Sequence, residues 1–188
     1  MEQLYSKKGF NMKGQYFSFD AIIATVIMVI AFITLVAYWL GAQSIIDSRA
    51  NNTYADAIRV ADSLFAPGSP SNWNSPLLSL ADIKQIGLSN NFDNQFNVSK
   101  ISRLAFLVNH NNPTPNPEVY AATKNLFRVT DYLIVIESTD GSQVYPGAPA
   151  RIAIGFDHLE LAKQISIADR GASVNGKAVR MRVYVFTT

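Results

Sequence analysis

The chain has no cysteine in its 188 residues, which excludes disulfide bonds and thiolate metal clusters. Charge is also scarce: 16% of the residues are charged and the formal net charge is +2, so the sequence lacks the basic surface that nucleic-acid-binding proteins need. The length suits one globular domain with an anchor and is too short for two full-sized domains. We therefore expect a single head domain and no nucleic-acid partner.

Charged residues are missing altogether between Asp20 and Asp47. Within this gap, residues 21–40 read AIIATVIMVIAFITLVAYWL, with neither glycine nor proline and with Thr25 and Thr34 as the only polar aliphatic residues. As a helix the run is about 30 Å long, which matches the hydrocarbon thickness of a bilayer. The segment predicts a single membrane-spanning helix.

The residues around this helix predict its orientation. Lys7, Lys8 and Lys13 precede it, whereas Arg49 is the only basic residue among the fifteen that follow it. Since positive charge favours the cytoplasmic side, we expect a cytoplasmic N-terminus and an extracellular C-terminal part. A conventional cleaved signal is the alternative, but its apolar core is about 7 to 15 residues long and is followed by a small-x-small site. Gly41-Ala42 is a poor candidate for such a site.

Just before the apolar run, residues 13–20 read KGQYFSFD. This segment resembles the class III signal peptide of archaeal type IV pilins and pilin-like proteins, in which a prepilin-type membrane peptidase cuts after a Lys/Arg-Gly pair and before Gln. The resemblance implies a processing site at Lys13, Gly14 and Gln15, with cleavage between Gly14 and Gln15 and retention of the apolar helix. A glycine suits such a site because it lets a protease approach the backbone closely.

The resemblance also implies an assembly surface at the start of the mature helix. Pilins commonly carry a glutamate at the fifth mature position, where its charge pairs with the terminal amine of a neighbouring subunit. Here the acid is Asp20, the sixth residue counted from Gln15. Asp20 can equally be a residue at the helix N-terminus that complements the helix dipole at the interface. The implied helix-packing residues are Asp20, Phe19, Ile22, Ile23 and Val26.

A looser similarity covers most of the remaining chain. In many archaeal pilin-like proteins a Trp, a Gly-Leu turn, a short helix, a Tyr-containing helix and a Tyr-rich strand follow the long helix. The corresponding features here are Trp73, Gly87-Leu88, residues 100–108, residues 120–127 and residues 131–137. The resemblance implies a pilin-like fold.

The apolar helix is expected to continue beyond the membrane, from about Tyr16 to Phe65, and to end before Pro67-Gly68. A helical stripe of Tyr54, Ile58, Ala61 and Phe65 predicts the face that packs on a core, and Arg49, Asn52, Asp56, Arg59 and Ser63 fall on the opposite side. Arg59 lies three residues from both Asp56 and Asp62, which predicts two ion pairs. We divide the chain into a leader (1–14), a long helix (15–66) and a head domain (67–188).

Patterns in the head domain predict an α+β fold. Short helices are expected over residues 79–86, 98–108 and 118–127, and strands over residues 132–136, 151–156, 172–174 and 178–186. Asn175-Gly176 predicts a type I′ hairpin turn. In the last strand, Val179, Met181, Val183 and Val185 alternate with Arg180, Arg182, Tyr184 and Phe186, which predicts one buried face. We expect a small antiparallel sheet of about four strands packed against the outer half of the long helix.

The sequence carries little that predicts catalysis. His110 lies in a loop rich in Pro and Asn. Asp157, His158 and Glu160 could bind a metal, but such closely spaced side chains would face different sides. Phosphate-loop, nucleophile-elbow and zinc-helix motifs are absent from the sequence. We expect no catalytic residue, no metal and no cofactor. Two sequons mark possible glycosylation at Asn51 and Asn97.

Two functions stay open from the sequence. The first is a structural subunit, major or minor, of a type IV pilus-like surface filament, with the membrane, the prepilin-type peptidase and copies of itself as partners. The second is a permanently anchored surface domain for ligand binding or adhesion. Its candidate contacts are Trp73 and Tyr145, for each of which the alternative is a packing role. Bulky replacement of Gly14 separates the two, because it blocks maturation only in the first.

Overall fold

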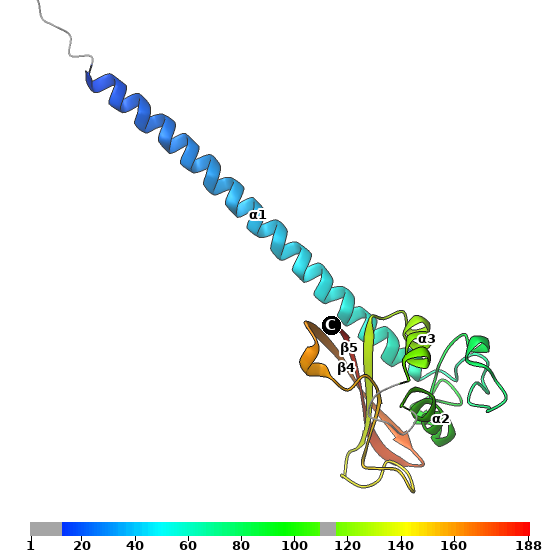
Figure 1. Ribbon diagram of the computed structural model, residues 1–188. Helices are drawn as coiled ribbons and strands as arrows, with labels where there is room; N and C mark the ends of the chain where they lie inside the picture. Colours follow the sequence, from blue (N-terminus) through cyan, green and yellow to red (C-terminus); the bar gives the residue numbers. More distant parts are fainter. Residues whose placement is uncertain (1–12, 110–115) are drawn as a thin grey trace, which may run out of the picture. The chain divides into compact units, whose positions relative to one another are not determined.

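A computed structural model describes residues 13–109 and 116–188, without the side chains of residues 13–18 and 49–51. The chain divides into two compact units, Met1–Asp47 and Ser48–Thr188, which are described separately. The elements are shown in Figure 1. They are α1 (Lys13–Leu64), the 3-10 helix η1 (Leu80–Asp82), β1 (Gln95–Phe96), α2 (Val98–Asn109), α3 (Pro117–Phe127), β2 (Asp131–Ser138), β3 (Arg151–Gly155), the 3-10 helix η2 (Leu159–Leu161), β4 (Gln164–Val174) and β5 (Lys177–Thr187).

The fold is α+β, with a long apolar N-terminal helix and a five-stranded mixed sheet. The strand order is β1-β4-β5-β2-β3. The pairs β4–β5, β5–β2 and β2–β3 are antiparallel, and β1 adds to the end of β4 as a parallel strand. The prediction of about four antiparallel strands was therefore wrong in number and in type, because β1 has only two residues and is defined by its pairing with β4.

The β4–β5 hairpin confirms the predicted turn. Asn175 and Gly176 both have positive φ, at 50° and 79°, as a type I′ turn requires. The strand before the turn begins at Gln164, well ahead of the predicted residue 172. The four valine and methionine positions of β5 are buried as expected, but Phe186 on the opposite face is fully buried as well. It belongs to a small second cluster with Leu133 and Val135.

The last turns of α1 belong to the core of the second unit. The fully buried helix residues are Ala57, Val60, Ala61 and Leu64. The predicted stripe was therefore displaced, since Tyr54 is 53% exposed. Small alanines at two of the four buried positions allow the helix backbone to lie close to its neighbours.

Polar contacts on this part of α1 differ in part from those predicted. Arg59 pairs with Asp56 at 2.9 Å, as expected. It does not pair with Asp62, because its guanidinium instead donates to the carbonyl of Phe127 at 2.7 Å. Asp62 pairs with Arg170 of β4 at 3.1 Å. These contacts fasten α1 to the C-terminal end of α3 and to the sheet.

The segment after α1 is packed around Trp73. Its side chain is fully buried, and the indole N–H donates to the carbonyl of Gly87 at 2.8 Å. At Gly87 an added Cβ would lie 2.0 Å from the carbonyl oxygen of Ala66, so only glycine fits this approach. Trp73 is therefore a packing residue of the core, and not the exposed contact that was the other interpretation. The predicted helix over residues 79–86 shrinks to η1, since Ile83 and Ile86 are drawn into the core from a non-helical backbone.

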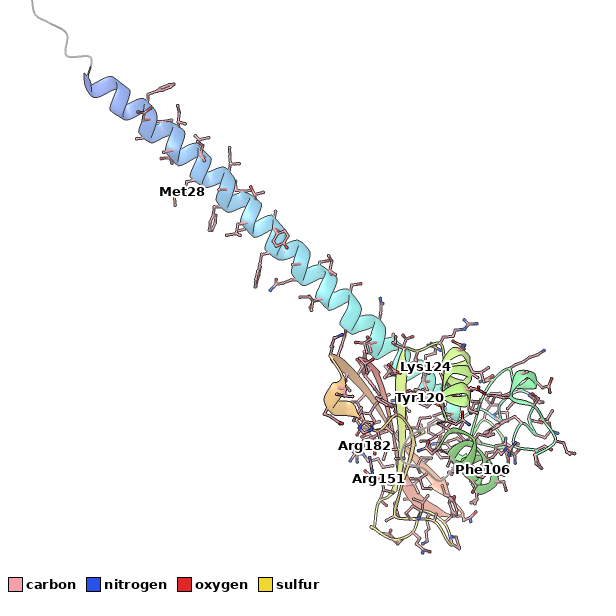
Figure 2. The ribbon with its side chains drawn as sticks, viewed as in Figure 1. Met28, Phe106, Tyr120, Lys124, Arg151 and Arg182 are labelled. Atoms are coloured by element: carbon pink, nitrogen blue, oxygen red, sulfur yellow. The ribbon has the colours of Figure 1, made fainter. Side chains whose placement is uncertain are left out.

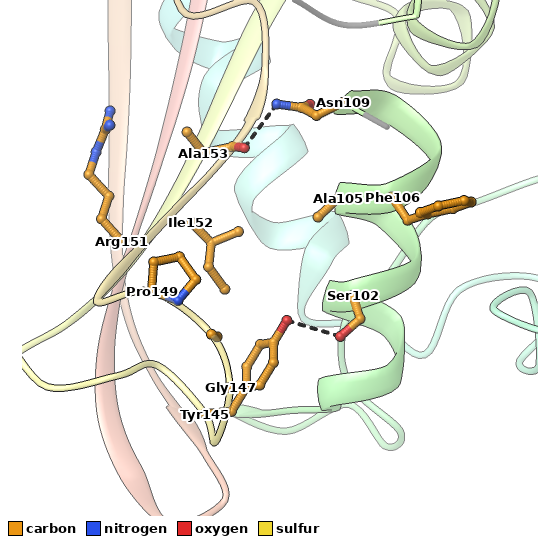
Figure 3. Close-up of a pocket in the computed structure, with 11 residues that line it drawn as sticks. Ser102, Ala105, Phe106, Asn109, Tyr145, Gly147, Pro149, Arg151, Ile152 and Ala153 are labelled. Atoms are coloured by element: carbon orange, nitrogen blue, oxygen red, sulfur yellow. Dashed lines mark hydrogen bonds between the residues drawn. The ribbon is translucent and has the colours of Figure 1, made fainter. Parts of the chain in front are cut away.

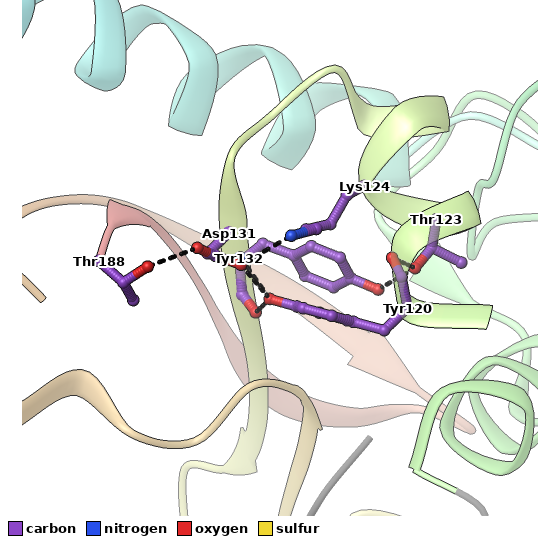
Figure 4. Close-up of polar contacts among 6 residues, drawn as sticks. All are labelled: Tyr120, Thr123, Lys124, Asp131, Tyr132 and Thr188. Atoms are coloured by element: carbon purple, nitrogen blue, oxygen red, sulfur yellow. Dashed lines mark hydrogen bonds and ion pairs between the residues drawn. The ribbon is translucent and has the colours of Figure 1, made fainter. Parts of the chain in front are cut away.

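Buried tyrosines fasten α3 to the start of β2 (Figure 4). The hydroxyl of Tyr120 accepts from the backbone N–H of Tyr132 at 3.0 Å and donates to its carbonyl at 3.1 Å. The hydroxyl of Tyr132 shares a 2.6 Å hydrogen bond with Thr123, and Lys124 pairs with Asp131 at 3.0 Å. Burial raises the pKa of both tyrosines, so each stays protonated and can donate.

Candidate functional site: the exposed apolar helix surface

The part of α1 in the first unit presents an apolar surface that no other described residue covers. Between residues 19 and 46, seventeen large apolar side chains are 40% to 77% exposed, and Met28 is labelled among them in Figure 2. They are Phe19, Ile22, Ile23, Val26, Ile27, Met28, Val29, Ile30, Phe32, Ile33, Leu35, Val36, Tyr38, Trp39, Leu40, Ile45 and Ile46. We call this set the apolar helix surface.

Length and composition of this helix are sufficient to cross a membrane. The most apolar 18-residue window of Phe19–Leu64 has a mean hydropathy of 2.7, and none of that window is buried. Burying one large apolar side chain contributes about 1.5 to 3 kcal/mol, so covering seventeen exposed side chains would be strongly favourable. Contiguous exposed patches of this kind mark surfaces that contact other proteins or lipid.

The two threonine hydroxyls within this stretch of α1 are hydrogen-bonded inside the helix. The Thr25 hydroxyl donates to the carbonyl of Ala21 at 2.8 Å, and the Thr34 hydroxyl donates to that of Ile30 at 2.5 Å. Such bonds to the carbonyl four residues earlier replace water as the hydroxyl's partner. The surface can therefore enter lipid or a helix bundle without leaving either hydroxyl unpaired.

The predicted packing residues share one side of this helix. Phe19, Ile22, Ile23 and Val26 are spaced i, i+3, i+4 and i+7, so they form a stripe, and all four are at least 45% exposed. Asp20 is exposed and, at about 100° per residue, lies beside this stripe. The role of Asp20 in charge pairing stays a prediction.

The predicted processing site coincides with the start of α1. Lys13, Gly14 and Gln15 are the first three residues of the helix, and their side chains lie outside the described residues. Cleavage between Gly14 and Gln15 stays a prediction. The side chain of Asn51, the first sequon residue, also lies outside the described residues, as does the whole of His110.

The second sequon residue, Asn97, is the N-cap of α2. Its side-chain oxygen, Oδ1, accepts from the backbone N–H groups of Ser99 at 2.8 Å and Lys100 at 3.3 Å. Its side-chain nitrogen donates to the side-chain oxygen of Asn90 at 3.0 Å. The cap uses only the side-chain oxygen, so modification of the nitrogen would leave the helix cap in place.

A cavity of about 510 Å³ lies between α2 and β3 (Figure 3). Tyr145, the second candidate contact, lines it with its hydroxyl 3.0 Å from that of Ser102. Asn109 closes one end by donating to the carbonyl of Ala153 at 3.1 Å and accepting from the N–H of Gly155 at 3.0 Å. The lining consists of Ser102, Ala105, Phe106, Asn109, Tyr145, Gly147, Ala148, Pro149, Arg151, Ile152 and Ala153. Among the described residues that line this cavity, Arg151 and Tyr145 are the ionisable ones.

The candidate metal ligands near η2 form two separate pairs. His158 contacts Glu160 at 2.8 Å, whereas Asp157 lies 3.8 Å from Arg151. A backbone hydrogen bond, and then the hydrogen bond from His158, lower the pKa of Glu160. Within residues 13–109 and 116–188, no three His, Asp or Glu side chains are grouped so as to hold a metal ion.

Sequence reasoning missed a second, polar pocket. It measures about 310 Å³, and five of its lining residues carry amide side chains: Asn90, Asn91, Gln95, Asn97 and Asn175. The other lining residues are Asp93, Phe96, Val98 and Ser99. We call it the amide pocket. The density of amides over residues 90–97 was visible in the sequence, but the contribution of the distant hairpin turn was not.

Comparison with known proteins finds no matching family model, no matching curated protein and no matching solved structure.

Proposed function

We propose that the protein is a structural subunit, major or minor, of an archaeal type IV pilus-like surface filament. The main observation in support is the apolar helix surface, which has seventeen exposed apolar side chains and no charged residue between Asp20 and Asp47. In lipid this surface is stable, and against identical helices it remains equally dry. A subunit can therefore leave the bilayer once a bundle of such helices exists to receive it.

The proposed path begins with a single-pass membrane protein. The N-terminus lies in the cytoplasm and the head domain, residues 67–188, lies outside the cell. A prepilin-type peptidase removes residues 1–14, in keeping with the resemblance of KGQYFSFD to class III signal peptides. Residues 15–66 then form the filament core, and the heads are displayed at the cell surface.

The packing of α1 supports a load-transmitting connection to the head. Ala57, Val60, Ala61 and Leu64 belong to the head's own core, so this end of the helix cannot detach without exposing that core. Arg59 adds two bonds to the carbonyls of Phe127 and Arg128. A pilin-like arrangement, with helix and sheet sharing one core, would hold the head while the helix is gripped by its neighbours.

The test is a pair of glycine substitutions in the leader of the full chain. Gly14→Val should block cleavage and filament assembly, because a branched side chain hinders protease access to the backbone. Gly9→Val is the matched control, since Gly9 also follows a lysine but precedes Phe10 instead of glutamine. It should leave the mature N-terminus at Gln15.

The readout is the N-terminal sequence and size of protein released by shearing. The proposal expects high-molecular-weight fibres whose subunits begin at Gln15. A detergent-soluble monomer that keeps Met1, unaffected by Gly14→Val, would instead favour a permanently anchored surface domain. That alternative is favoured by the amide pocket and not by Trp73, which is buried.

A further inference from the structure

The chemistry of the amide pocket excludes several ligand classes. No Lys, Arg or His is among its described lining residues, so these offer no cation to bind an anion. Asp93 is its single carboxylate, too few for a hard divalent cation, which prefers several charged oxygens. Phe96 is 2% exposed and presents little apolar area. A neutral ligand rich in hydroxyl groups fits this lining.

Three of the five amides have hydrogen-bonding capacity to spare. The side chains of Asn91, Gln95 and Asn175 make no hydrogen bond to any other described residue. Each carries an acceptor oxygen and a donor nitrogen a short distance apart. Adjacent hydroxyls of a pyranose ring donate and accept at a similar spacing, so each free amide can pair with two of them.

The pocket walls are held in place without a ligand. The buried hydroxyl of Ser89 contacts the carboxylate of Asp93 and accepts from the N–H of Asn91 at 3.2 Å. The ammonium of Lys100 donates to the carbonyl of Ser89 at 2.7 Å. The parallel pairing of β1 with the end of β4 brings the loop to the hairpin turn that carries Asn175. A pre-formed site of this kind loses little entropy on binding.

An exposed aromatic ring belongs to the same loop. Phe92 lies in sequence between Asn91 and Asp93, and it is 86% exposed. Aromatic faces pack against the C–H faces of sugars, so this ring gives the loop a second kind of contact with a saccharide.

We propose that the amide pocket is a saccharide site that holds a neutral pyranose. The sugar has two possible sources. One is a glycan attached to Asn97, which is one of the lining residues and whose sequon is complete. The other is a free saccharide, for example from a cell envelope. The inference is independent of the filament proposal, because the pocket lies wholly in residues 90–175.

The experiment uses the full chain, purified in detergent from its natural host and from a host without N-glycosylation. Intact mass and peptide mapping show whether Asn97 carries sugar. Saturation-transfer NMR of the unglycosylated protein with glucose, galactose, mannose and N-acetylglucosamine measures free binding. Val98→Pro removes the sequon while keeping every amide, because proline is tolerated at the first position of a helix.

Two substitutions test the pocket itself. Asn91→Ala removes one free amide, and Asn175→Gly removes another while keeping the positive φ of the turn. Each should weaken sugar binding about tenfold, as the loss of one to two hydrogen bonds predicts. Asn72→Ala, an exposed amide outside the pocket, is the control.

The outcomes are distinct. An attached glycan held by the pocket is identified by two results together. Mass is added at Asn97 and disappears in Val98→Pro, and Asn91→Ala lowers the melting temperature only of the glycosylated protein. Binding of a tested sugar that Val98→Pro keeps and Asn91→Ala weakens identifies a free ligand. The proposal is overturned if Asn97 is unmodified and no tested sugar binds, or if glycan or sugar is present and both pocket substitutions leave its effects unchanged.

Discussion

Replacing the buried lysine of α2 tests whether one ammonium group holds the base of the head domain together. Lys100 is 3% exposed, and its ammonium donates to the carbonyls of Pro67 and Ser89, each at 2.7 Å. These two carbonyls belong to the segment after α1 and to the loop that forms the amide pocket. Lys100→Met keeps the aliphatic stem and leaves both carbonyls without this donor.

The expected loss follows from two opposing terms. Hydrogen bonds to a charged group contribute about 1.5 to 3 kcal/mol each, so two contribute about 3 to 6 kcal/mol. Against this, removing the ammonium relieves the cost of its burial, which also lowers the pKa of Lys100 below its ordinary value. We expect Lys100→Met to lower the free energy of unfolding by about 2 to 4 kcal/mol.

The sign of the pH dependence adds a second readout. Because the pKa of Lys100 is lower in the folded protein than in the unfolded chain, the unfolded state binds more protons between the two values. The contribution of this group to stability therefore rises with pH over that window, which ends near the ordinary lysine pKa. Lys100→Met should remove this rise.

Chemical denaturation of the full chain in detergent, followed by tryptophan fluorescence of the buried Trp73, measures both quantities. Lys84→Met, at an exposed lysine, is the control and should change stability by less than about 0.5 kcal/mol. A Lys100→Met protein as stable as the wild type, with an unchanged pH profile, would refute the reasoning.

Two further substitutions test the packing of the head. Gly87→Ala should lower the free energy of unfolding by about 1 to 3 kcal/mol or more, because its Cβ would lie 2.0 Å from the Ala66 carbonyl oxygen. Gly171→Ala is the control and should be neutral or stabilising, because no atom lies within 4 Å of its added Cβ. Equal effects of the two substitutions in thermal unfolding would contradict this. Tyr120→Phe should cost about 1 to 3 kcal/mol, since it leaves the N–H of Tyr132 without its acceptor; an unchanged denaturation midpoint would show that the hydroxyl is dispensable.

Local chemistry explains what the sequence could predict. Asn175-Gly176 is a turn that needs positive φ at both residues, and those two residue types adopt it readily, so the hairpin was predicted and confirmed. The helices α2 and α3 were predicted to within one residue at each end, since apolar periodicity and flanking breakers mark them. Composition alone was sufficient to predict the apolar stretch of α1.

Tertiary contacts explain the errors. The two residues of β1 become a strand only because β4 lies beside them, which no local pattern reports. The buried face of α1 centres on Ala57 and Ala61, because close approach favours small residues over the larger Tyr54. Lys100 is buried because two distant carbonyls receive its ammonium, and charged residues are otherwise predicted at the surface.

The amide pocket also depends on tertiary contacts that local sequence patterns do not predict. Its loop residues were predicted as a loop, and Asn175 was predicted as part of a turn. Their juxtaposition depends on the parallel pairing of β1 with β4, which joins positions about eighty residues apart in the sequence.

Contact between the α1 helices of neighbouring copies is the central claim, and cysteine cross-linking tests it most directly. The chain has no cysteine of its own, so single substitutions such as Val26→Cys on the apolar helix surface and Asn72→Cys on the head provide unique attachment points. Sheared, membrane-free material would be treated with a short bismaleimide and analysed for covalent dimers. The account predicts dimers from a series of positions between 19 and 46, and its central claim is contradicted if these positions yield only monomers while the head position yields dimers.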